Sequence, residues 1–124
     1  MDFILVTGGA GFIGIHTTIL LIERGYNVII IDSLITNSKK GIDKLSKNYI
    51  IKNGISKSRL KFMRGDLRNI NFLRDIFMKE IKLGNRINCV IHFAGLKSVK
   101  ESIEYPDRYW DINVNGTISL LKVM

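Results

Sequence analysis

A cluster of glycines near the start of the chain constrains the fold more than any other feature of the sequence. Four of the eleven glycines lie between Thr7 and Gly14, in the order Thr-Gly-Gly-Ala-Gly-Phe-Ile-Gly. An apolar run at residues 3–6 precedes the cluster and is typical of a buried strand of a parallel sheet. The apolar segment at residues 12–24 follows it and is long enough for a helix. A strand, a glycine turn and a helix in this order predict the start of a β-α-β unit.

The alternation of strand and helix continues along the rest of the chain. Hydrophobic patterning predicts strands at residues 27–31, 60–63 and 88–93, and helices at residues 39–53, 69–83 and from Pro106 to the end. Strands that are apolar throughout favour a parallel sheet buried on both faces. We therefore predict an α/β fold, a Rossmann-type doubly wound parallel sheet of about four strands with helices on both faces.

Length and composition exclude several classes of protein. The chain has 124 residues, and we predict one Rossmann domain over residues 1–124. The single cysteine, Cys89, excludes an intramolecular disulfide and a multi-cysteine zinc site. No apolar run approaches the roughly 20 residues of a membrane span, and no basic segment precedes the first apolar stretch as in a secretory signal. These features predict a soluble cytoplasmic protein with no bound metal and no membrane partner.

The net charge of +8 comes almost entirely from one segment, residues 39–61. Eight lysines and arginines lie there against one acid, Asp43, so this basic segment carries +7 and the rest of the chain +1. Tyr49 is its only aromatic residue, whereas single-stranded nucleic acids are bound by basic residues interleaved with aromatic ones. We interpret the segment as solvated surface and predict no nucleic-acid partner. A patch that attracts phosphate is the alternative.

The most unusual residues of the sequence directly follow the predicted strands. Thr7 and Gly8 end the first strand and Asp32 ends the second. Asp66 follows the third strand, and Phe-Ala-Gly at residues 93–95 ends the fourth. Ligands of open parallel sheets bind at the carboxyl ends of the strands. We therefore expect these residues to form one ligand site.

The glycine cluster fits two versions of a dinucleotide-binding pattern. Gly9, Gly11 and Gly14 match G-x-G-x-x-G. Gly8, Gly11 and Gly14 match the variant G-x-x-G-x-x-G. The first glycines permit the tight turn, Gly11 lets a pyrophosphate approach the backbone, and Gly14 lets the helix pack closely on the sheet. The helix then offers free N–H groups and its positive dipole end to the phosphates. A glycine-rich turn without a ligand is the alternative.

Asp32 ends the second predicted strand, 21 residues after Gly11. An acidic residue at about this distance accepts hydrogen bonds from the hydroxyls of an adenosine ribose and repels a 2′-phosphate. The position therefore predicts NAD rather than NADP as the cofactor.

Other candidate residues each have a structural alternative. Asp66 can bond an adenine amino group, or it can serve as a helix N-cap or turn aspartate. Lys97 can meet a phosphate or ribose, or lie on the surface. We interpret His16 and His92 as packed histidines rather than catalytic bases, and Cys89 as an inert core thiol. Three aromatic residues near the last helix are interpreted as core or interface: Tyr105, Tyr109 and Trp110.

Four segments carry a resemblance to a known family. They are residues 7–14, Gly-Asp-Leu-Arg at 65–68, His-Phe-Ala-Gly-Leu-Lys at 92–97 and Asn-Val-Asn-Gly-Thr at 113–117. The most specific stretch is residues 93–102. Together they resemble the UDP-glucose 4-epimerases, which are NAD-dependent extended short-chain dehydrogenases/reductases, and the resemblance covers essentially the whole chain.

The resemblance implies a function and a set of contacts. Members of the family hold NAD tightly, oxidise the C4 hydroxyl of a UDP-sugar to a 4-keto intermediate and return hydride to the other face, so that UDP-glucose and UDP-galactose interconvert. The family is usually dimeric, so a homodimer is implied. The implied NAD contacts are Gly8, Gly11, Phe12, Ile13 and Gly14 at the pyrophosphate, Asp32, Ser33, Asn37 and Ser38 at the adenosine ribose, Asp66 and Leu67 at adenine, Phe93, Ala94, Gly95 and Lys97 towards the nicotinamide, and Asn113.

The sequence departs from the family pattern at three places. Residues 32–38 are one longer than the usual D-N-x-x-N-S, and Ile112 stands where an asparagine contact to the cofactor can occur. The catalytic serine or threonine and the Tyr-x-x-x-Lys pair have no match up to Met124, and neither has the nucleotide-sugar domain. We therefore assign no catalytic residue and expect this chain to be the N-terminal NAD-binding part of such an enzyme, inactive alone.

Expectations about behaviour and function follow. A sheet that stops at its fourth strand leaves an apolar edge, which favours self-association and modest stability. The leading hypothesis for function is the NAD-binding part of a UDP-glucose 4-epimerase. The alternatives are a non-catalytic NAD-binding module, part of a related nucleotide-sugar dehydratase or decarboxylase, and a basic interaction protein.

Overall fold

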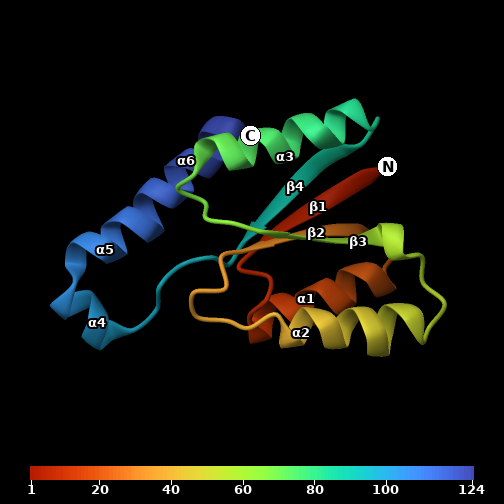
Figure 1. The fold of residues 1–124 in the computed structure, drawn as a ribbon, viewed down its shortest axis with the longest axis horizontal. Coiled ribbons are helices and arrows are strands. Elements are labelled where there is room, and N and C mark those ends of the chain that lie inside the picture. Colours follow the sequence, from red (N-terminus) through yellow and green to blue (C-terminus); the bar gives the residue numbers. More distant parts are fainter.

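The computed structural model describes residues 1–124 and contains one parallel sheet of four strands (Figure 1). The strands are β1 (Asp2–Thr7), β2 (Asn27–Asp32), β3 (Leu60–Arg64) and β4 (Arg86–His92). Their order across the sheet is β3-β2-β1-β4, and every neighbouring pair is parallel. This order confirms the predicted Rossmann-type α/β fold.

Helices connect the strands and follow the last one. They are α1 (Phe12–Glu23), α2 (Lys40–Lys44), η1 (Leu45–Ile51), η2 (Lys57–Arg59), α3 (Ile70–Lys82), α4 (Val99–Glu104), α5 (Pro106–Trp110), η3 (Asp111–Asn115) and α6 (Gly116–Val123). The wider turns of η1 and η3 continue α2 and α5 without a break, so the helices expected at residues 39–53 and after Pro106 are confirmed in outline. None of these helices combines the length and the apolar surface that crossing a membrane would need.

Two hydrophobic cores lie on opposite faces of the sheet. Helices α3 and α6 cover one face, and α1 with α2 and η1 covers the other (Figure 1). In β1, Phe3 and Leu5 belong to the first core together with Leu73 of α3, whereas Val6 belongs to the second. Both faces of the central strands are therefore buried, which explains why those strands are apolar at nearly every position.

The strand order also determines where a ligand can lie. From β1 the chain passes to β2 and β3 on one side of the sheet and then crosses to β4 on the other side. The loops that leave β1 and β4 therefore diverge, and they open a crevice at the carboxyl ends of these strands. Helices α4 and α5 lie beyond this end of the sheet (Figure 1).

The edge strand β4 is less buried than its apolar sequence predicts. Only β1 pairs with it, so its outer side has no partner strand in this chain, as expected for the fourth strand. Cys89 in β4 is exposed, and its interpretation as a core thiol is therefore wrong. The reason is position, because Cys89 lies beside Ile4 on the face that α1 covers, and α1 packs over β1 and β2 rather than over β4. Self-association through this edge stays a prediction.

Helix α4 is the element that hydrophobic patterning missed. Ser98 precedes it, and the Ser98 hydroxyl oxygen accepts a hydrogen bond from the Glu101 N–H at 3.3 Å. A serine followed three residues later by a glutamate is a recognised signal for a helix N-terminus. The signal was present in the sequence, but the helix has only six residues and none of them is buried.

The basic segment divides into two parts in the structure. Its six lysines before Arg59 are exposed, as expected for solvated surface. Arg59 instead donates hydrogen bonds to the carbonyl oxygens of Ile22 and Tyr26, at 2.9 and 2.8 Å. Lys61 forms an ion pair with the buried Glu80 at 2.6 Å. The last two cations therefore stabilise the fold and do not contribute to an open basic surface.

Candidate cofactor-binding site

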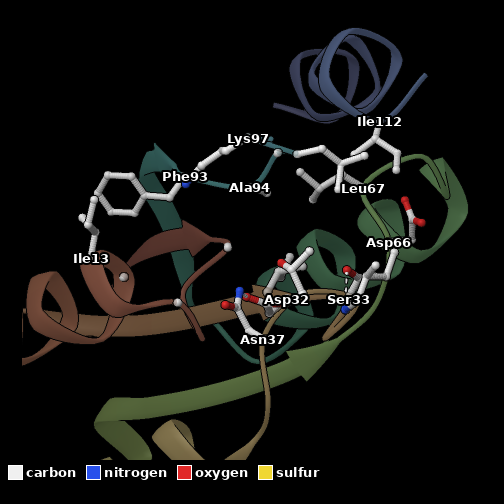
Figure 2. Close-up of a pocket in the computed structure, with 18 of the residues that line it drawn as sticks. Ile13, Asp32, Ser33, Asn37, Asp66, Leu67, Phe93, Ala94, Lys97 and Ile112 are labelled. Carbon is white, nitrogen blue, oxygen red and sulfur yellow. Dashed lines mark hydrogen bonds between the residues drawn. The ribbon is translucent and has the colours of Figure 1, made fainter. Parts of the chain in front are cut away.

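A cavity of about 470 Å³ lies at the carboxyl ends of the strands (Figure 2). Nearly all residues predicted to contact a cofactor line it: Gly8, Gly11, Phe12, Ile13, Gly14, Asp32, Ser33, Asn37, Asp66, Leu67, Phe93, Ala94, Gly95 and Lys97. Ser38 and Asn113 are the two that do not. Figure 2 shows Ile13 and Phe93 at one end of the cavity, and Asp66, Leu67 and Ile112 at the other. Residues from all four strand ends therefore meet at one site.

Gly8 and Gly14 are required because they lie against the protein's own backbone. A Cβ atom on Gly8 would lie 2.6 Å from the backbone nitrogen of Ala94, and Gly8 also has a φ of +64°. A Cβ atom on Gly14 would lie 2.5 Å from the Cα of Gly9. Gly14 thus lets α1 pack against the glycine turn itself, rather than against the sheet as expected. Any side chain at these two positions would displace backbone.

Gly11 differs from its neighbours because no protein atom crowds it. The nearest atom to a Cβ built on Gly11 is the carbonyl oxygen of Gly8, at 3.4 Å, which is an ordinary contact. Its φ of −75° is accessible to any residue. Gly11 nevertheless lines the cavity. The protein alone therefore gives no reason for glycine here, whereas a ligand that approaches the backbone would.

The first turn of α1 presents unpaired hydrogen-bond donors to the cavity. No acceptor in the protein bonds the N–H groups of Phe12, Ile13 or Gly14, and the first intrahelical bond runs from the Ile15 N–H to the Gly11 carbonyl oxygen at 2.9 Å. The N-cap, Gly11, has no side chain that could accept from them, and the first turn contains no acid. Free donors at the positive end of a helix dipole form an anion site.

Asp32 is held at the end of β2 by three hydrogen bonds. One carboxylate oxygen accepts from the Leu34 N–H at 2.8 Å, and the other accepts from the Ala10 N–H at 3.0 Å and the Asn37 side-chain amide at 3.3 Å. The residue is 5% exposed and lines the cavity. Because a carboxylate offers about four acceptor positions, Asp32 can still accept from a ligand hydroxyl.

The loop after Asp32 has a strained backbone at the point where the sequence is one residue longer than the family pattern. Leu34 has a φ of +60°, the only positive φ among the residues other than glycine. The left-handed conformation costs a leucine roughly 1 kcal/mol or more. The Asp32 bond to the Leu34 N–H compensates for part of this strain. The loop accommodates its extra residue here and still brings Ser33 and Asn37 to the cavity.

Asp66 at the end of β3 is paired with a basic residue that sequence analysis missed. The Arg68 guanidinium donates to Asp66 at 2.7 Å and to Asp111 of η3 at 2.7 Å, and so ties the β3–α3 loop to η3. The hydrogen bonds from Arg68 hold the pKa of the Asp66 carboxyl below its usual value. Asn69, and not Asp66, caps α3 through the Phe72 N–H. The N-cap interpretation of Asp66 is therefore wrong.

The turn interpretation of Asp66 is confirmed. The Arg68 N–H donates to an Asp66 carboxylate oxygen at 2.9 Å, which closes a two-residue side-chain turn. Asp66 nevertheless lines the cavity, so its turn role and its predicted contact with adenine can coexist.

Asn113 acts on the loop after β4 instead of reaching the cavity. Its side-chain oxygen accepts from the Leu96 N–H at 2.8 Å, and its side-chain nitrogen donates to the Leu96 carbonyl oxygen at 3.0 Å. This pair of bonds fixes the loop that carries Phe93, Gly95 and Lys97 along the cavity wall. Asn113 therefore does not line the cavity itself but supports the loop whose residues are predicted to contact the nicotinamide side.

Several cavity residues were not predicted as site residues. Tyr109 and Glu101 line the wall, and the Tyr109 hydroxyl accepts from the Ser98 N–H at 2.9 Å and donates to the Glu101 carboxylate at 3.2 Å. Ile112, singled out as a departure from the family, also lines the cavity. Tyr105 and Trp110 are 56% and 64% exposed, so they are not core residues, because α4 and α5 extend beyond the sheet and its cores. Their interpretation as interface residues stays a prediction.

The two histidines have different environments. His16 is exposed on the outer side of α1 and bonds the carbonyl oxygen of Phe12 at 2.8 Å, so its interpretation as a packed residue is wrong. His92 is exposed as well, so its interpretation as a packed residue is also wrong, but both of its ring nitrogens are bonded, by Thr7 at 2.6 Å and by Thr117 at 2.9 Å. Desolvation lowers the pKa of His92.

The profile of one protein family, described as GDP-mannose 4,6 dehydratase, matches residues 5–124. The chain belongs to this family. Among its relatives, a bifunctional UDP-glucose 4-epimerase and UDP-xylose 4-epimerase 1 of Pisum sativum is 45% identical over 121 residues, which are 98% of this chain and 32% of the pea protein. A UDP-glucose 4-epimerase of Yersinia enterocolitica is 43% identical over 121 residues, with the same two coverages of 98% and 32%.

Comparison with solved structures also finds UDP-glucose 4-epimerases. The crystal structure of a UDP-glucose 4-epimerase from Bifidobacterium longum, in complex with NAD+ and UDP, superimposes with a TM-score of 0.83 at 39% identity. The match covers 98% of this chain and 33% of that one. The resemblance to UDP-glucose 4-epimerases is therefore confirmed. The chain spans about a third of the length of the curated relatives it matches.

Proposed function

We propose that this chain binds NAD in the cavity as the cofactor-binding part of a UDP-glucose 4-epimerase. The observation that carries the proposal is Gly11, whose open side faces the cavity beside the unpaired N–H groups of α1. Packing explains Gly8 and Gly14 but not Gly11, and a pyrophosphate against the backbone explains it. The relatives named as UDP-glucose 4-epimerases, at 42–45% identity, support the same assignment.

The residues present fit each part of the cofactor. The first turn of α1 would bind the pyrophosphate, and Asp32 would accept from the adenosine ribose, with Ser33, Asn37 and Ser38 nearby. Asp66 and Leu67 would contact adenine. The β4–α4 loop would run along the nicotinamide side through Phe93, Ala94, Gly95 and Lys97, with Asn113 supporting that loop through Leu96. When bound, NAD supplies a hydride acceptor for the sugar C4 position.

The reaction proposed for the whole enzyme is the interconversion of UDP-glucose and UDP-galactose through a 4-keto sugar. The chain contains no tyrosine followed by a lysine four residues later, so the acid/base pair of the family has no match in residues 1–124. Catalysis would need groups from the other two thirds of the length that the relatives have. We further propose that residues 1–124 form one NAD-binding domain. The whole enzyme is proposed to be a homodimer in the cytoplasm. The alternatives of a non-catalytic module and a basic interaction protein are not favoured by these relatives.

Calorimetric titration of NAD into the chain tests the proposal. Gly11→Ala places a methyl group where the pyrophosphate would lie while meeting no protein atom closer than 3.4 Å. We expect affinity for NAD to fall about tenfold or more with little change in Tm. Gly41→Ala is the matched control, because its added Cβ also makes only ordinary contacts, at 3.5 Å, and it lies outside the residues that line the cavity. Equal NAD affinity in the wild type and Gly11→Ala would overturn the proposal.

A further inference from the structure

His92 connects three elements directly beneath the cavity. It ends β4, immediately before the cavity residues Phe93 and Ala94. Its Nδ1 atom lies 2.6 Å from the hydroxyl of Thr7 at the end of β1, and its Nε2 atom lies 2.9 Å from the hydroxyl of Thr117 in α6. Thr7 is fully buried, whereas the His92 ring has access to solvent.

The directions of these hydrogen bonds follow from counting protons. The Thr117 hydroxyl donates its only hydrogen to the carbonyl oxygen of Asn113 at 2.6 Å, so it must accept from His92 Nε2. In a neutral ring with its proton on Nε2, Nδ1 is an acceptor. It takes the hydrogen of the Thr7 hydroxyl, whose oxygen accepts from the Ala94 N–H at 3.3 Å. Neutral His92 in this tautomer satisfies every partner.

A protonated His92 cannot satisfy the same partners. Nδ1 would then carry a hydrogen that points at the Thr7 oxygen, and the Thr7 hydrogen would lose its acceptor. The other partner of that oxygen, the Ala94 N–H, is itself a donor. The hydrogen-bond partners of the ring are Thr7 from β1 and Thr117 from α6, neither of which titrates or carries charge. Neither partner offers a negative charge to the added proton, and desolvation lowers the pKa of the ring.

The chain of bonds holds the β4–α4 loop at two points. At the first, Thr7 fixes the Ala94 N–H, and Gly8 packs so closely on Ala94 that a Cβ would overlap it. At the second, Asn113 accepts from Thr117 through its carbonyl oxygen and binds both backbone polar groups of Leu96 through its side chain. Both points belong to residues 93–98, which line the cavity next to the glycine turn.

We propose that neutral His92 is a positioning residue that locks the β4–α4 loop in the form that binds the cofactor, and that protonation of its ring releases the loop. The cofactor part of this proposal rests on the proposed function. Because burial already opposes the charged ring, the lock is complete above the ordinary histidine pKa near 6.5 and is lost as the pH falls through the lower pKa of the folded protein.

The first test needs no cofactor. Nitrogen-15 spectra of the His16→Asn variant, in which His92 is the only histidine, should show the Nε2–H tautomer and yield the His92 pKa. Exchange of the Ala94 and Leu96 amide hydrogens should accelerate, beyond the ordinary pH dependence of exchange, once His92 is protonated. An Nδ1–H tautomer overturns the proposal. Exchange rates of these amides that do not change when His92 is protonated, beyond the ordinary pH dependence, also overturn it.

The second test measures affinity for NAD one pH unit above and one below the His92 pKa. We expect the wild type and His16→Asn to lose about tenfold in affinity at the lower pH. His92→Asn keeps an acceptor near Nδ1 but does not titrate, so it should change less than twofold relative to its own value at the higher pH. His92→Leu removes the acceptor and should bind about tenfold more weakly at both pH values.

The outcomes separate this proposal from the proposed function. If His92→Asn loses affinity with pH as the wild type does, the lock is refuted while NAD binding stands. If the wild type fails to bind NAD at neutral pH but the amides respond to His92 as expected, the lock stands and the proposed function fails.

Discussion

The ion pair between Lys61 and Glu80 gives a prediction whose size follows from the structure. Glu80 is 1% exposed, and one of its carboxylate oxygens accepts from Lys61 Nζ at 2.6 Å and from the Asn85 side-chain amide at 2.8 Å. The other oxygen has no hydrogen-bond partner. Lys61 also lies over the ring of Phe3, 4.5 Å from its centroid. Glu80 therefore depends on one cation.

Lys61→Met keeps the aliphatic contact with Phe3 and removes the charge. Loss of one partner of a buried pair costs about 3–5 kcal/mol, because the remaining charge stays desolvated. For a domain of this size that corresponds to a fall in Tm of roughly 10–20 °C. Thermal unfolding monitored by circular dichroism measures the fall. Lys39→Met is the matched control, since the exposed pair of Lys39 with Asp43 at 3.9 Å should contribute no more than about 0.5 kcal/mol.

A double variant decides whether the charge is responsible. Replacing both partners, as Lys61→Met with Glu80→Leu, removes the buried charge together with its counter-ion. Stability should then recover by most of the loss, because apolar replacements of buried ion pairs are often neutral. The reasoning is refuted if Lys61→Met shifts Tm no more than Lys39→Met, or if the double variant is as unstable as the single one.

Three further predictions concern the site. Gly14→Ala should destabilise the fold by about 1–3 kcal/mol in urea unfolding, because its Cβ would lie 2.5 Å from the Gly9 Cα; unchanged stability would refute the packing argument. NAD should bind at least about tenfold more tightly than NADP in calorimetry, because Asp32 repels a 2′-phosphate; equal affinities would contradict that role. Arg68 holds the Asp66 pKa below 3.8, so stability from this pair should be complete above that pH and disappear as pH falls through the lowered value. The stability of Arg68→Ala should lack the part that this ion pair contributes and that acid removes. Identical acid unfolding of the wild type and Arg68→Ala would argue against it.

Much of the fold could be predicted because its signals are local. Buried parallel strands give continuous apolar runs, and glycines after helices mark the turns. The doubly wound arrangement followed from the connection rules for parallel sheets, which place successive crossovers with one hand. The degree of burial along β4 could not be predicted in this way. Its central residues Cys89, Val90 and Ile91 are apolar like those of β2, but its position at the edge leaves Cys89 exposed.

Some residues of the site could be predicted from the sequence and others could not. Gly8 and Gly11 belong to the turn after β1 and Asp32 ends β2, so the rule for sheet ends located them at the cavity. Arg68 and Asp111 lie 43 positions apart, and their pairing needs the docking of η3 beside the β3–α3 loop. Tyr109, Glu101 and Ser98 reach the cavity wall because α4 and α5 lie beyond the carboxyl ends of the strands. Such contacts between distant elements have no spacing pattern in the sequence.

The most direct test of the central claim is an amide proton and nitrogen NMR titration of the chain with NAD. The account predicts that the largest shifts occur at the glycine turn, with Gly11 and Ile13 foremost, and at the β2 and β4 strand ends around Ser33 and Ala94. The exposed lysines of the basic segment, residues 39–61, should shift little. Shifts confined to the basic segment, or no shifts at millimolar NAD, would contradict the claim that this cavity holds the cofactor.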